Sequence, residues 1–174
     1  VAQSLAITKP QRVSALILSN TAHKIGTAEM WNARIDAVKV HGLASLVDPV
    51  MERWFTPAFR RSDNPLYAGA RTMLARQSAQ GYSGTCAAIR DADYTEAVAH
   101  IAAPTLCVAG DQDGSTSPDL VRAMADRIPG SRFVEIADCG HIPCLEQPSA
   151  YAAAVASFLR DLSLGNATAP ASDR

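Results

Sequence analysis

The chain has 174 residues, of which 48% are hydrophobic and 19% are charged, and its formal net charge at pH 7 is −1. This composition suits a globular domain with a packed core and argues against extended disorder. A charge so close to zero gives no electrostatic reason to expect a nucleic acid or a membrane surface as partner. The longest apolar runs are too short to cross a bilayer, and the four cysteines do not form a disulfide framework. We therefore expect a soluble cytoplasmic protein.

The chain begins with Val1 rather than methionine, and residues 1–9 follow a helical pattern that ends at Pro10. No capping or turn residue precedes this pattern, so we expect the chain to start inside an element, as a fragment of a longer protein would. Residues 12–19 then form a short apolar run, typical of a strand buried on both faces. Asn20 is interpreted as the residue that ends this strand.

From residue 27 to residue 101, apolar residues recur at three- and four-residue spacing and are interrupted by prolines and a glycine. This pattern predicts a series of short helices with no strand between them. Alternation of strand and helix then resumes. The elements predicted there are a strand at 103–110, a helix at 117–128, a strand at 131–137 and a helix at 147–162.

The predicted order is helix, strand, an all-helical insertion, and two further strand–helix units. Crossover helices favour a parallel sheet, whose strand carboxyl ends normally carry the functional site. Three strands are too few for a stable doubly wound sheet, so we expect further strands upstream of the chain. The prediction is an α/β fold with core segments at 1–26 and 102–163, a helical cap at 27–101 and a flexible tail at 164–174.

Two loops follow the predicted strand ends, and each holds one candidate catalytic residue, Asp113 and His141. An acid on one loop and a histidine on the next build an acid–histidine pair, in which the carboxylate orients the imidazole and stabilises its charged form. Asp111 and Asp119 are alternative acids, and Asp113 is preferred for its spacing from Gly110. A turn carboxylate and a surface histidine are the structural alternatives.

Cys139 and Cys144 flank His141, which raises the alternative of a metal or redox site. A structural zinc ion needs four ligands, and the chain has no second Cys/His pair at zinc spacing. The two cysteines also lack the C-x-x-C spacing of redox pairs. We therefore predict no metal site, and we interpret Cys86 and Cys107 as small core residues.

The two loops resemble the carboxy-terminal part of the α/β-hydrolase fold. The acid loop reads Gly-Asp-Gln-Asp at 110–113 and continues to Ser117-Pro118, against a family pattern of Gly-x-x-Asp and then Thr-Pro or Ser-Pro. The histidine loop has Gly140-His141 and then Glu146-Gln147-Pro148, against Gly-His followed by Glu-x-Pro. The helical insertion at 27–101 lies where the family carries its cap.

Within that fold the chain is most similar to 3-oxoadipate enol-lactonases of the β-ketoadipate pathway of aromatic catabolism, through residues 18–31, 51–59 and 81–94 and the two loops. The resemblance implies hydrolysis of 3-oxoadipate enol-lactone by a Ser-His-Asp triad that includes Asp113 and His141, with no metal or organic cofactor. The alternatives are a carboxylesterase, a haloperoxidase-like hydrolase, a C–C bond hydrolase or a non-catalytic ligand-binding pseudohydrolase on the same fold.

The family's nucleophile lies in Gly-x-Ser-x-Gly at a strand-to-helix turn, and this pattern is absent from the 174 residues. Gly81-Tyr82-Ser83-Gly84 has the wrong spacing. Residues 1–10 resemble the helix that follows that turn, so we expect the serine and the oxyanion hole upstream. We expect the chain alone to be inactive, with the missing amino-terminal half on the same polypeptide or on a companion chain.

The enol-lactone carries a carboxylate beside an apolar ring, so its pocket should offer a cation and flat apolar walls. Lys24, just after the strand at 12–19, is the predicted cation, and Trp31 and Trp54 are the predicted aromatic walls. A solvated lysine and tryptophans in the core of the cap are the structural alternatives. The predicted partner is thus a small lactone or ester, and the sequence does not indicate the oligomeric state.

Overall fold

Three parallel strands form the sheet of this protein, for which the computed structural model describes residues 1–167, the last four as backbone only. The strands are β1 (Leu16–Ser19), β2 (Thr105–Gly110) and β3 (Arg132–Ile136), in the order β1-β2-β3. Leu18 lies opposite Cys107, and Cys107 lies opposite Phe133. Because all three strands run the same way, their carboxyl ends meet at one edge of the sheet.

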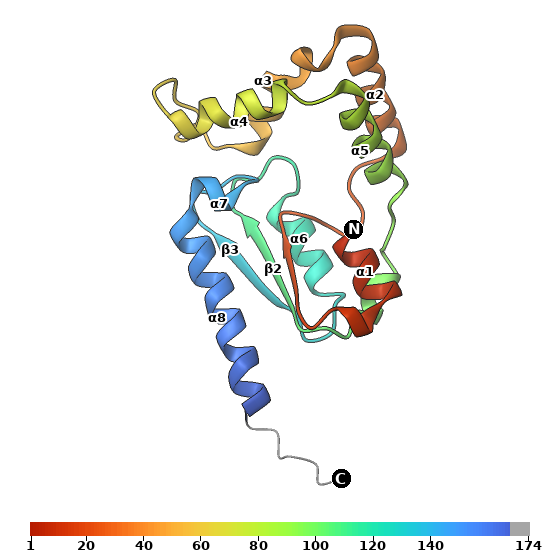
Figure 1. Cartoon of the computed structure of the whole chain (residues 1–174), viewed down its shortest axis with the longest axis vertical. Coiled ribbons are helices and arrows are strands. Elements are labelled where there is room, and N and C mark those ends of the chain that lie inside the picture. The colour runs from red at the N-terminus through yellow and green to blue at the C-terminus, as the bar shows by residue number, and fades with distance from the viewer. Residues whose placement is uncertain (168–174) are drawn as a thin grey trace.

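Helices cover both faces of this sheet. The α1 helix (Ala2–Thr8) and the α6 helix (Pro118–Ala125) pack on the face that carries Cys107, whereas α8 (Pro148–Ala167) packs through Phe158 on the face that carries Val108 (Figure 1). All six residues of the central β2 strand are buried. A strand covered on both faces has no solvent side, which explains its unbroken apolar pattern.

The helices from α2 to α5 lie above the carboxyl ends of the strands (Figure 1). Their apolar residues form two clusters, one around Met51, Phe55 and Leu74 and one around Trp31 and Cys86. No strand interrupts this part of the described chain. The cap helices are α2 (Ala28–His41), η2 (Leu43–Leu46), α3 (Val47–Trp54), α4 (Pro65–Ala75) and α5 (Ala79–Asp91). The short helix η3 (Ala97–His100), predicted as part of the cap at 27–101, instead lies beside α1 and packs Val98 into the core of the sheet.

The predicted order of strands and helices is confirmed, and the differences concern where elements begin and end. The β1 strand starts only at Leu16, because residues 10–12 form a short 3-10 helix, η1 (Pro10–Arg12). The predicted helix at 147–162 is preceded by a separate short helix, α7 (Pro143–Glu146). Both α7 and α8 begin at a proline, which suits the first helical position because its missing N–H has no partner there.

The helix predicted at 147–162 continues as α8 to Ala167, into the segment predicted as a flexible tail at 164–174. A single glycine, Gly165, is tolerated inside a helix at a cost of about 1 kcal/mol. Residues 168–174 lie outside the described part of the chain.

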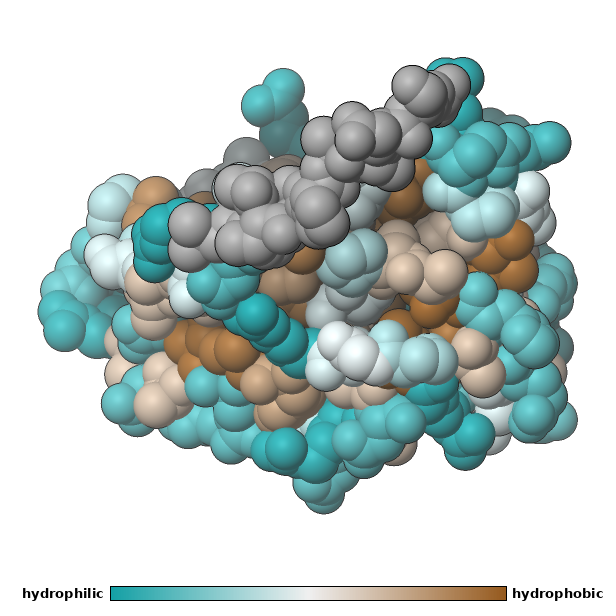
Figure 2. All heavy atoms as spheres, turned by 90° about the horizontal axis from the view of Figure 1, so that it is seen from below, coloured by the Kyte–Doolittle hydropathy of each residue, from teal (hydrophilic) through white to brown (hydrophobic). Residues whose placement is uncertain are grey.

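Apolar side chains reach the surface on the side of the molecule away from the cap. Viewed from that side, brown patches lie between hydrophilic ones (Figure 2). The large exposed apolar residues include Val1 and Leu5, on or beside α1. Within the described residues, β1 pairs with β2 alone. No described helix combines the length and the apolar character that crossing a bilayer requires.

Candidate active site

The loops after β2 and β3 bring Asp113 and His141 together at the carboxyl edge of the sheet. Nδ1 of His141 lies 2.8 Å from Oδ2 of Asp113, a hydrogen-bonded contact. The close approach of the two loops depends on Gly110, where a Cβ atom would lie 2.1 Å from the carbonyl oxygen of Gly140. The glycine of the acid loop is thus required by space rather than by an unusual backbone conformation.

Asp113 is buried, with 5% of its surface exposed, and both carboxylate oxygens are fully engaged. Oδ1 accepts hydrogen bonds from the backbone N–H groups of Ser115 (2.7 Å) and Thr116 (3.0 Å). Oδ2 accepts from the Thr116 hydroxyl (2.8 Å) and the Asn20 amide (3.0 Å), besides His141. This set of donors orients the carboxylate in one direction.

The pKa of Asp113 reflects two opposing effects. Burial by itself raises it, but the hydrogen bond and positive charge of His141, with further hydrogen bonds from Asn20 and Thr116, bring it below its ordinary value. Asp113 is therefore ionised at neutral pH and accepts the proton carried by Nδ1 of His141. The other ring nitrogen, Nε2, is left as the basic atom of the imidazole.

Asn20 is a member of this site that the sequence interpretation missed. Its amide Nδ2 donates to Asp113 and also to the carbonyl oxygen of Gly140, at 3.2 Å. Asn20 has φ of 50°, a left-handed conformation that asparagine tolerates better than most residues. The sequence signal that could have identified Asn20 is its position directly after β1. This position is at the sheet edge from which the other two loops also extend. All three strands thus contribute a side chain to the site.

The alternative acids lie elsewhere. Asp111 is exposed, and its Oδ1 accepts a hydrogen bond from the backbone N–H of Cys139 at 2.9 Å, so it links the two loops without contacting His141. Asp119 is exposed in the first turn of α6. Of these three carboxylates, Asp113 is the one in contact with the imidazole.

The end of α3 in the cap is bonded directly to both loops. The carbonyl oxygen of Arg53 accepts from the N–H of Gly114 at 3.0 Å, and that of Trp54 accepts from the N–H of His141 at 2.7 Å. The last carbonyls of a helix have no partner within the helix, so these two bonds satisfy them. The Trp54 ring also stacks on the His141 ring, with centroids 5.8 Å apart and planes at 25°.

Glu146 adds a second link between cap and core. Its Oε2 accepts from the N–H of Gly140 at 2.8 Å, next to His141. Its Oε1 accepts from the N–H of Thr56 at 2.9 Å and from the Thr56 hydroxyl. Thr56 and Gly140 are buried, so water cannot readily replace Glu146 as the acceptor for their N–H groups.

We expect Glu146→Ala to lower the free energy of unfolding by about 3 kcal/mol, because it leaves buried donors without an acceptor. The matched control is Glu135→Ala, which removes a carboxylate from an exposed ion pair with Arg122. That pair should contribute less than about 1 kcal/mol. Urea unfolding followed by tryptophan fluorescence measures both, and equal losses in the two variants would contradict the link described here.

A cavity of about 580 Å³ opens between the cap and the two loops. Trp31 and Trp54, the predicted aromatic walls, both line it together with His141. Trp31 is fixed by a 2.6 Å hydrogen bond from its Nε1 to the carbonyl oxygen of Ile25. The other lining residues are Asn20, Thr21, Ile25, Met30, Arg34, Arg53, Leu74, Gln77, Tyr82, Thr85, Cys86, Ile89, Gly114, Ser115 and Thr116.

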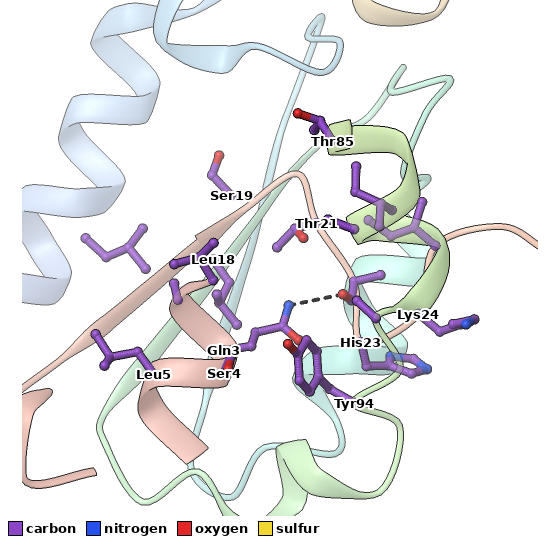
Figure 3. Close-up of a pocket in the computed structure, with 18 of the residues that line it drawn as sticks. Gln3, Ser4, Leu5, Leu18, Ser19, Thr21, His23, Lys24, Thr85 and Tyr94 are labelled. Carbon is purple, nitrogen blue, oxygen red and sulfur yellow. Dashed lines mark hydrogen bonds between the residues drawn. The ribbon is translucent and has the colours of Figure 1, made fainter. Parts of the chain in front are cut away.

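Lys24, the predicted cation of this cavity, does not line it. Its Nζ donates to the carbonyl oxygen of Arg90 at 3.3 Å and lies 3.8 Å from Asp93. It borders a separate cavity of about 750 Å³ beside α1, together with Gln3 and Tyr94 (Figure 3). The short segment after β1 turns the lysine away from His141, so the structure does not bring Lys24 into the site.

Arg34 and Arg53 are the cations that line the cavity instead. The Cζ atom of Arg34 lies 5.1 Å from the centroid of the Trp31 ring, within cation–π range. Burial lowers the pKa of Arg53, and the positive charge of Arg34 lowers it further. The available sequence signal was helical spacing, since Arg34 follows Trp31 by three residues on α2.

The cysteines beside His141 have different environments. Cys139 is fully buried and its thiol donates to the carbonyl oxygen of Gly140, whereas Cys144 is exposed. Burial raises the pKa of Cys139 to about 12, so its thiol remains protonated at neutral pH. Cys86 and Cys107 are buried in apolar clusters, as predicted.

A parallel sheet whose strand ends present an acid loop and then a histidine loop, beneath a helical cap, defines the α/β-hydrolase class. The chain belongs to the alpha/beta hydrolase family, whose sequence model matches residues 3–154. This confirms the resemblance inferred from the two loops.

The chain is similar to several individual proteins. The chain is 35% identical, over 158 residues, to 3-oxoadipate enol-lactonase 2 of Acinetobacter baylyi, covering 91% of this chain and 59% of that relative. The crystal structure of the enol-lactonase from Burkholderia xenovorans LB400 is 31% identical with a TM-score of 0.87, covering 91% and 61%. A thermophilic esterase from Thermogutta terrifontis is 26% identical with a TM-score of 0.85, covering 93% and 61%. The chain thus spans about three fifths of the length of these relatives.

Proposed function

We propose that the full-length protein containing this chain hydrolyses 3-oxoadipate enol-lactone to 3-oxoadipate. The observation that carries the proposal is the 2.8 Å contact between His141 and the buried Asp113 at the floor of an aromatic-walled cavity. The similarity to enol-lactonases supports the choice of substrate. We further propose that this hydrolysis is a step in the degradation of aromatic compounds.

In this mechanism His141 acts as a general base. Nε2 takes the proton of a serine hydroxyl while the serine oxygen attacks the lactone carbonyl carbon. Asp113, held by its other donors, stabilises the imidazolium that forms. The bond between the carbonyl carbon and the ring oxygen then breaks, and the ring oxygen departs as an enolate that remains attached through the acyl chain.

The acyl-enzyme is then resolved by water. The enolate takes a proton at carbon from the His141 imidazolium and becomes a ketone, which returns His141 to its neutral form. His141 next accepts a proton from water as the water oxygen attacks the acyl carbon, and it passes that proton to the departing serine oxygen. The products are 3-oxoadipate and the regenerated serine, and none of these steps needs a metal or an organic cofactor.

The serine of this mechanism has no counterpart of the Gly-x-Ser-x-Gly type within the 174 residues. We propose that a segment outside them supplies it, together with the backbone amides of the oxyanion hole. To act in this mechanism, the serine of that segment must reach Nε2 of His141 from the side of the cavity.

The test is a substrate panel assayed with the full-length protein: 3-oxoadipate enol-lactone, an aryl acetate and a vinylogous diketone. We expect kcat/KM for the lactone to exceed that for the aryl ester at least about tenfold, a difference equivalent to about 1.4 kcal/mol in transition-state binding.

The outcomes separate the proposal from its alternatives. A lactone that ranks last refutes the substrate assignment, and the leading substrate then identifies a carboxylesterase or a C–C bond hydrolase on the same fold. A haloperoxidase-like hydrolase is identified by peroxide-dependent halogenation in a parallel assay. Binding of lactone without turnover of any substrate indicates a ligand-binding pseudohydrolase.

A further inference from the structure

Arg34 on α2 and Arg53 on α3 face the cavity of His141 without an acidic partner. In the part of the chain described with side chains, residues 1–163, neither guanidinium lies within ion-pair distance of a carboxylate, and no carboxylate lines the cavity. Five arginines elsewhere in that part of the chain do have acidic partners, whereas exposed ones such as Arg12 and Arg76 are unpaired in water. The paired ones are Arg61 with Asp63, Arg71 with Asp48, Arg90 with Asp91, Arg122 with Glu135 and Arg132 with Asp161.

The environment of Arg53 makes this lack of partners costly. Its Nε atom is buried and has no hydrogen-bond partner. A partly buried cation without a counter-charge is unfavourable, and a second cation at Arg34 adds repulsion; burial first and this repulsion second lower the pKa of Arg53. An anion in the cavity would relieve both effects at once.

Both arginines are held in place before any ligand arrives. Arg34 lies over the face of Trp31, with Cζ 5.1 Å from the ring centroid. Arg53 is fixed through its own carbonyl, bonded to Gly114, and through the next residue, Trp54, bonded to His141. The backbone that carries Arg53 is therefore anchored to the two loops that carry Asp113 and His141.

We propose that Arg34 and Arg53 bind the free carboxylate of the substrate and so make the enzyme selective for anionic over neutral lactones. The inference deepens the proposed function and rests on it for the identity of the reacting group. Guanidinium groups match the planar geometry of a carboxylate and bind it through paired hydrogen bonds. The carboxylate lies between the arginines, the ring lies against Trp31 and Trp54, and the lactone carbonyl faces His141.

The first test measures selectivity in the full-length enzyme. Its two substrates are 3-oxoadipate enol-lactone and the neutral lactone that carries a methyl group in place of the carboxymethyl group. We expect Arg53→Gln and Arg34→Gln each to lower the ratio of kcat/KM for the anionic lactone to that for the neutral one by about 50-fold, as loss of charge-assisted hydrogen bonds implies.

Two further variants control this test. Arg71→Gln removes a guanidinium that is paired with Asp48 on the outside of the cap, and it should leave the ratio unchanged. Arg53→Lys keeps the charge without the forked donors and should give an intermediate ratio. An unchanged ratio in both glutamine variants overturns the proposal.

The second test measures binding without turnover. The two tryptophans of the chain both line the cavity, so their fluorescence reports its occupancy. We expect Arg53→Gln to weaken the binding of adipate at least about tenfold and to leave the binding of neutral adipamide unchanged. Inorganic phosphate is titrated in parallel, and tighter binding of phosphate than of adipate overturns the assignment to a carboxylate.

The two tests also separate this inference from the proposed function. If the enzyme hydrolyses the lactone but adipate binding does not depend on the arginines, the carboxylate site is refuted and lactone hydrolysis stands. If the enzyme hydrolyses no lactone but binds adipate through Arg34 and Arg53, the proposed reaction is refuted and the carboxylate site stands.

Discussion

Replacement of His141 by alanine is expected to lower kcat of the full-length enzyme on the enol-lactone by roughly 10⁵-fold, as loss of the histidine of a triad does in other hydrolases. The physical reason is that Nε2 of His141 is the basic atom of the site, since Nδ1 is committed to Asp113. Without it, neither the serine nor the hydrolytic water loses a proton at neutral pH. Steady-state hydrolysis of the lactone, with active protein quantified by its folded fraction, measures the effect.

The matched control for this variant is His41→Ala, which removes an exposed histidine at the end of α2, remote from Asp113. It should retain wild-type turnover. His141→Ala should also retain its fold, because the loop is held mainly through backbone bonds, such as that of His141 N–H to Trp54. Near-wild-type hydrolysis by His141→Ala, in a protein with the wild-type circular dichroism spectrum, would remove His141 from the mechanism.

The second large effect is expected from Asp113→Asn, which should lower kcat by about 10⁴-fold. The amide introduced by this substitution would present an N–H group to Nδ1 of His141. This favours the histidine tautomer that carries its proton on Nε2, and a protonated Nε2 cannot act as a base. Asp111→Asn is the matched comparison, because Asp111 bonds only the backbone of Cys139 in the neighbouring loop. Its effect on kcat should stay below about tenfold, and a larger loss in Asp111→Asn than in Asp113→Asn would reverse the assignment of the acid.

The same residue affects stability at low pH. The pKa of Asp113 is lower in the folded protein than in the unfolded chain, where an aspartate titrates near ~3.9. Its contribution to the free energy of unfolding is therefore fully present above that pH and is lost as the pH falls through the folded-state pKa. Denaturant unfolding across this range should show a steeper acid decline for the wild type than for Asp113→Asn.

Much of the sheet architecture was accessible from the sequence, because the responsible signals are local. An unbroken apolar run such as residues 105–110 indicates a strand covered on both faces, and Ser117-Pro118 marks a helix start by capping chemistry. Element ends were less accurate, as at the start of β1 and at the end of α8. The exact ends depend on hydrogen bonds in the neighbouring turns, and the residue pattern of the sequence does not reveal these bonds.

The cavity was harder to predict, because its lining comes from segments far apart in the chain. Lys24 was chosen for its place after β1, yet the direction of that side chain is set by packing against the segment around Arg90. Arg34 and Arg53 lie on two different helices, and only the packing of α2 and α3 over the loops turns both toward His141. Asn20 was missed for the same reason, since its role exists only where the ends of β1, β2 and β3 meet.

The sequence by itself determined the order of elements, the helical nature of residues 28–100 and the pairing of an acid loop with a histidine loop, since short motifs and periodicity encode these features. Only the tertiary structure decided which acid contacts His141 and which cations enter the cavity. Asp111 and Asp113 lie on the same loop, two residues apart, and both are acidic. Their different roles follow from hydrogen bonds to residues as far away as Asn20 and Cys139, which no local pattern records.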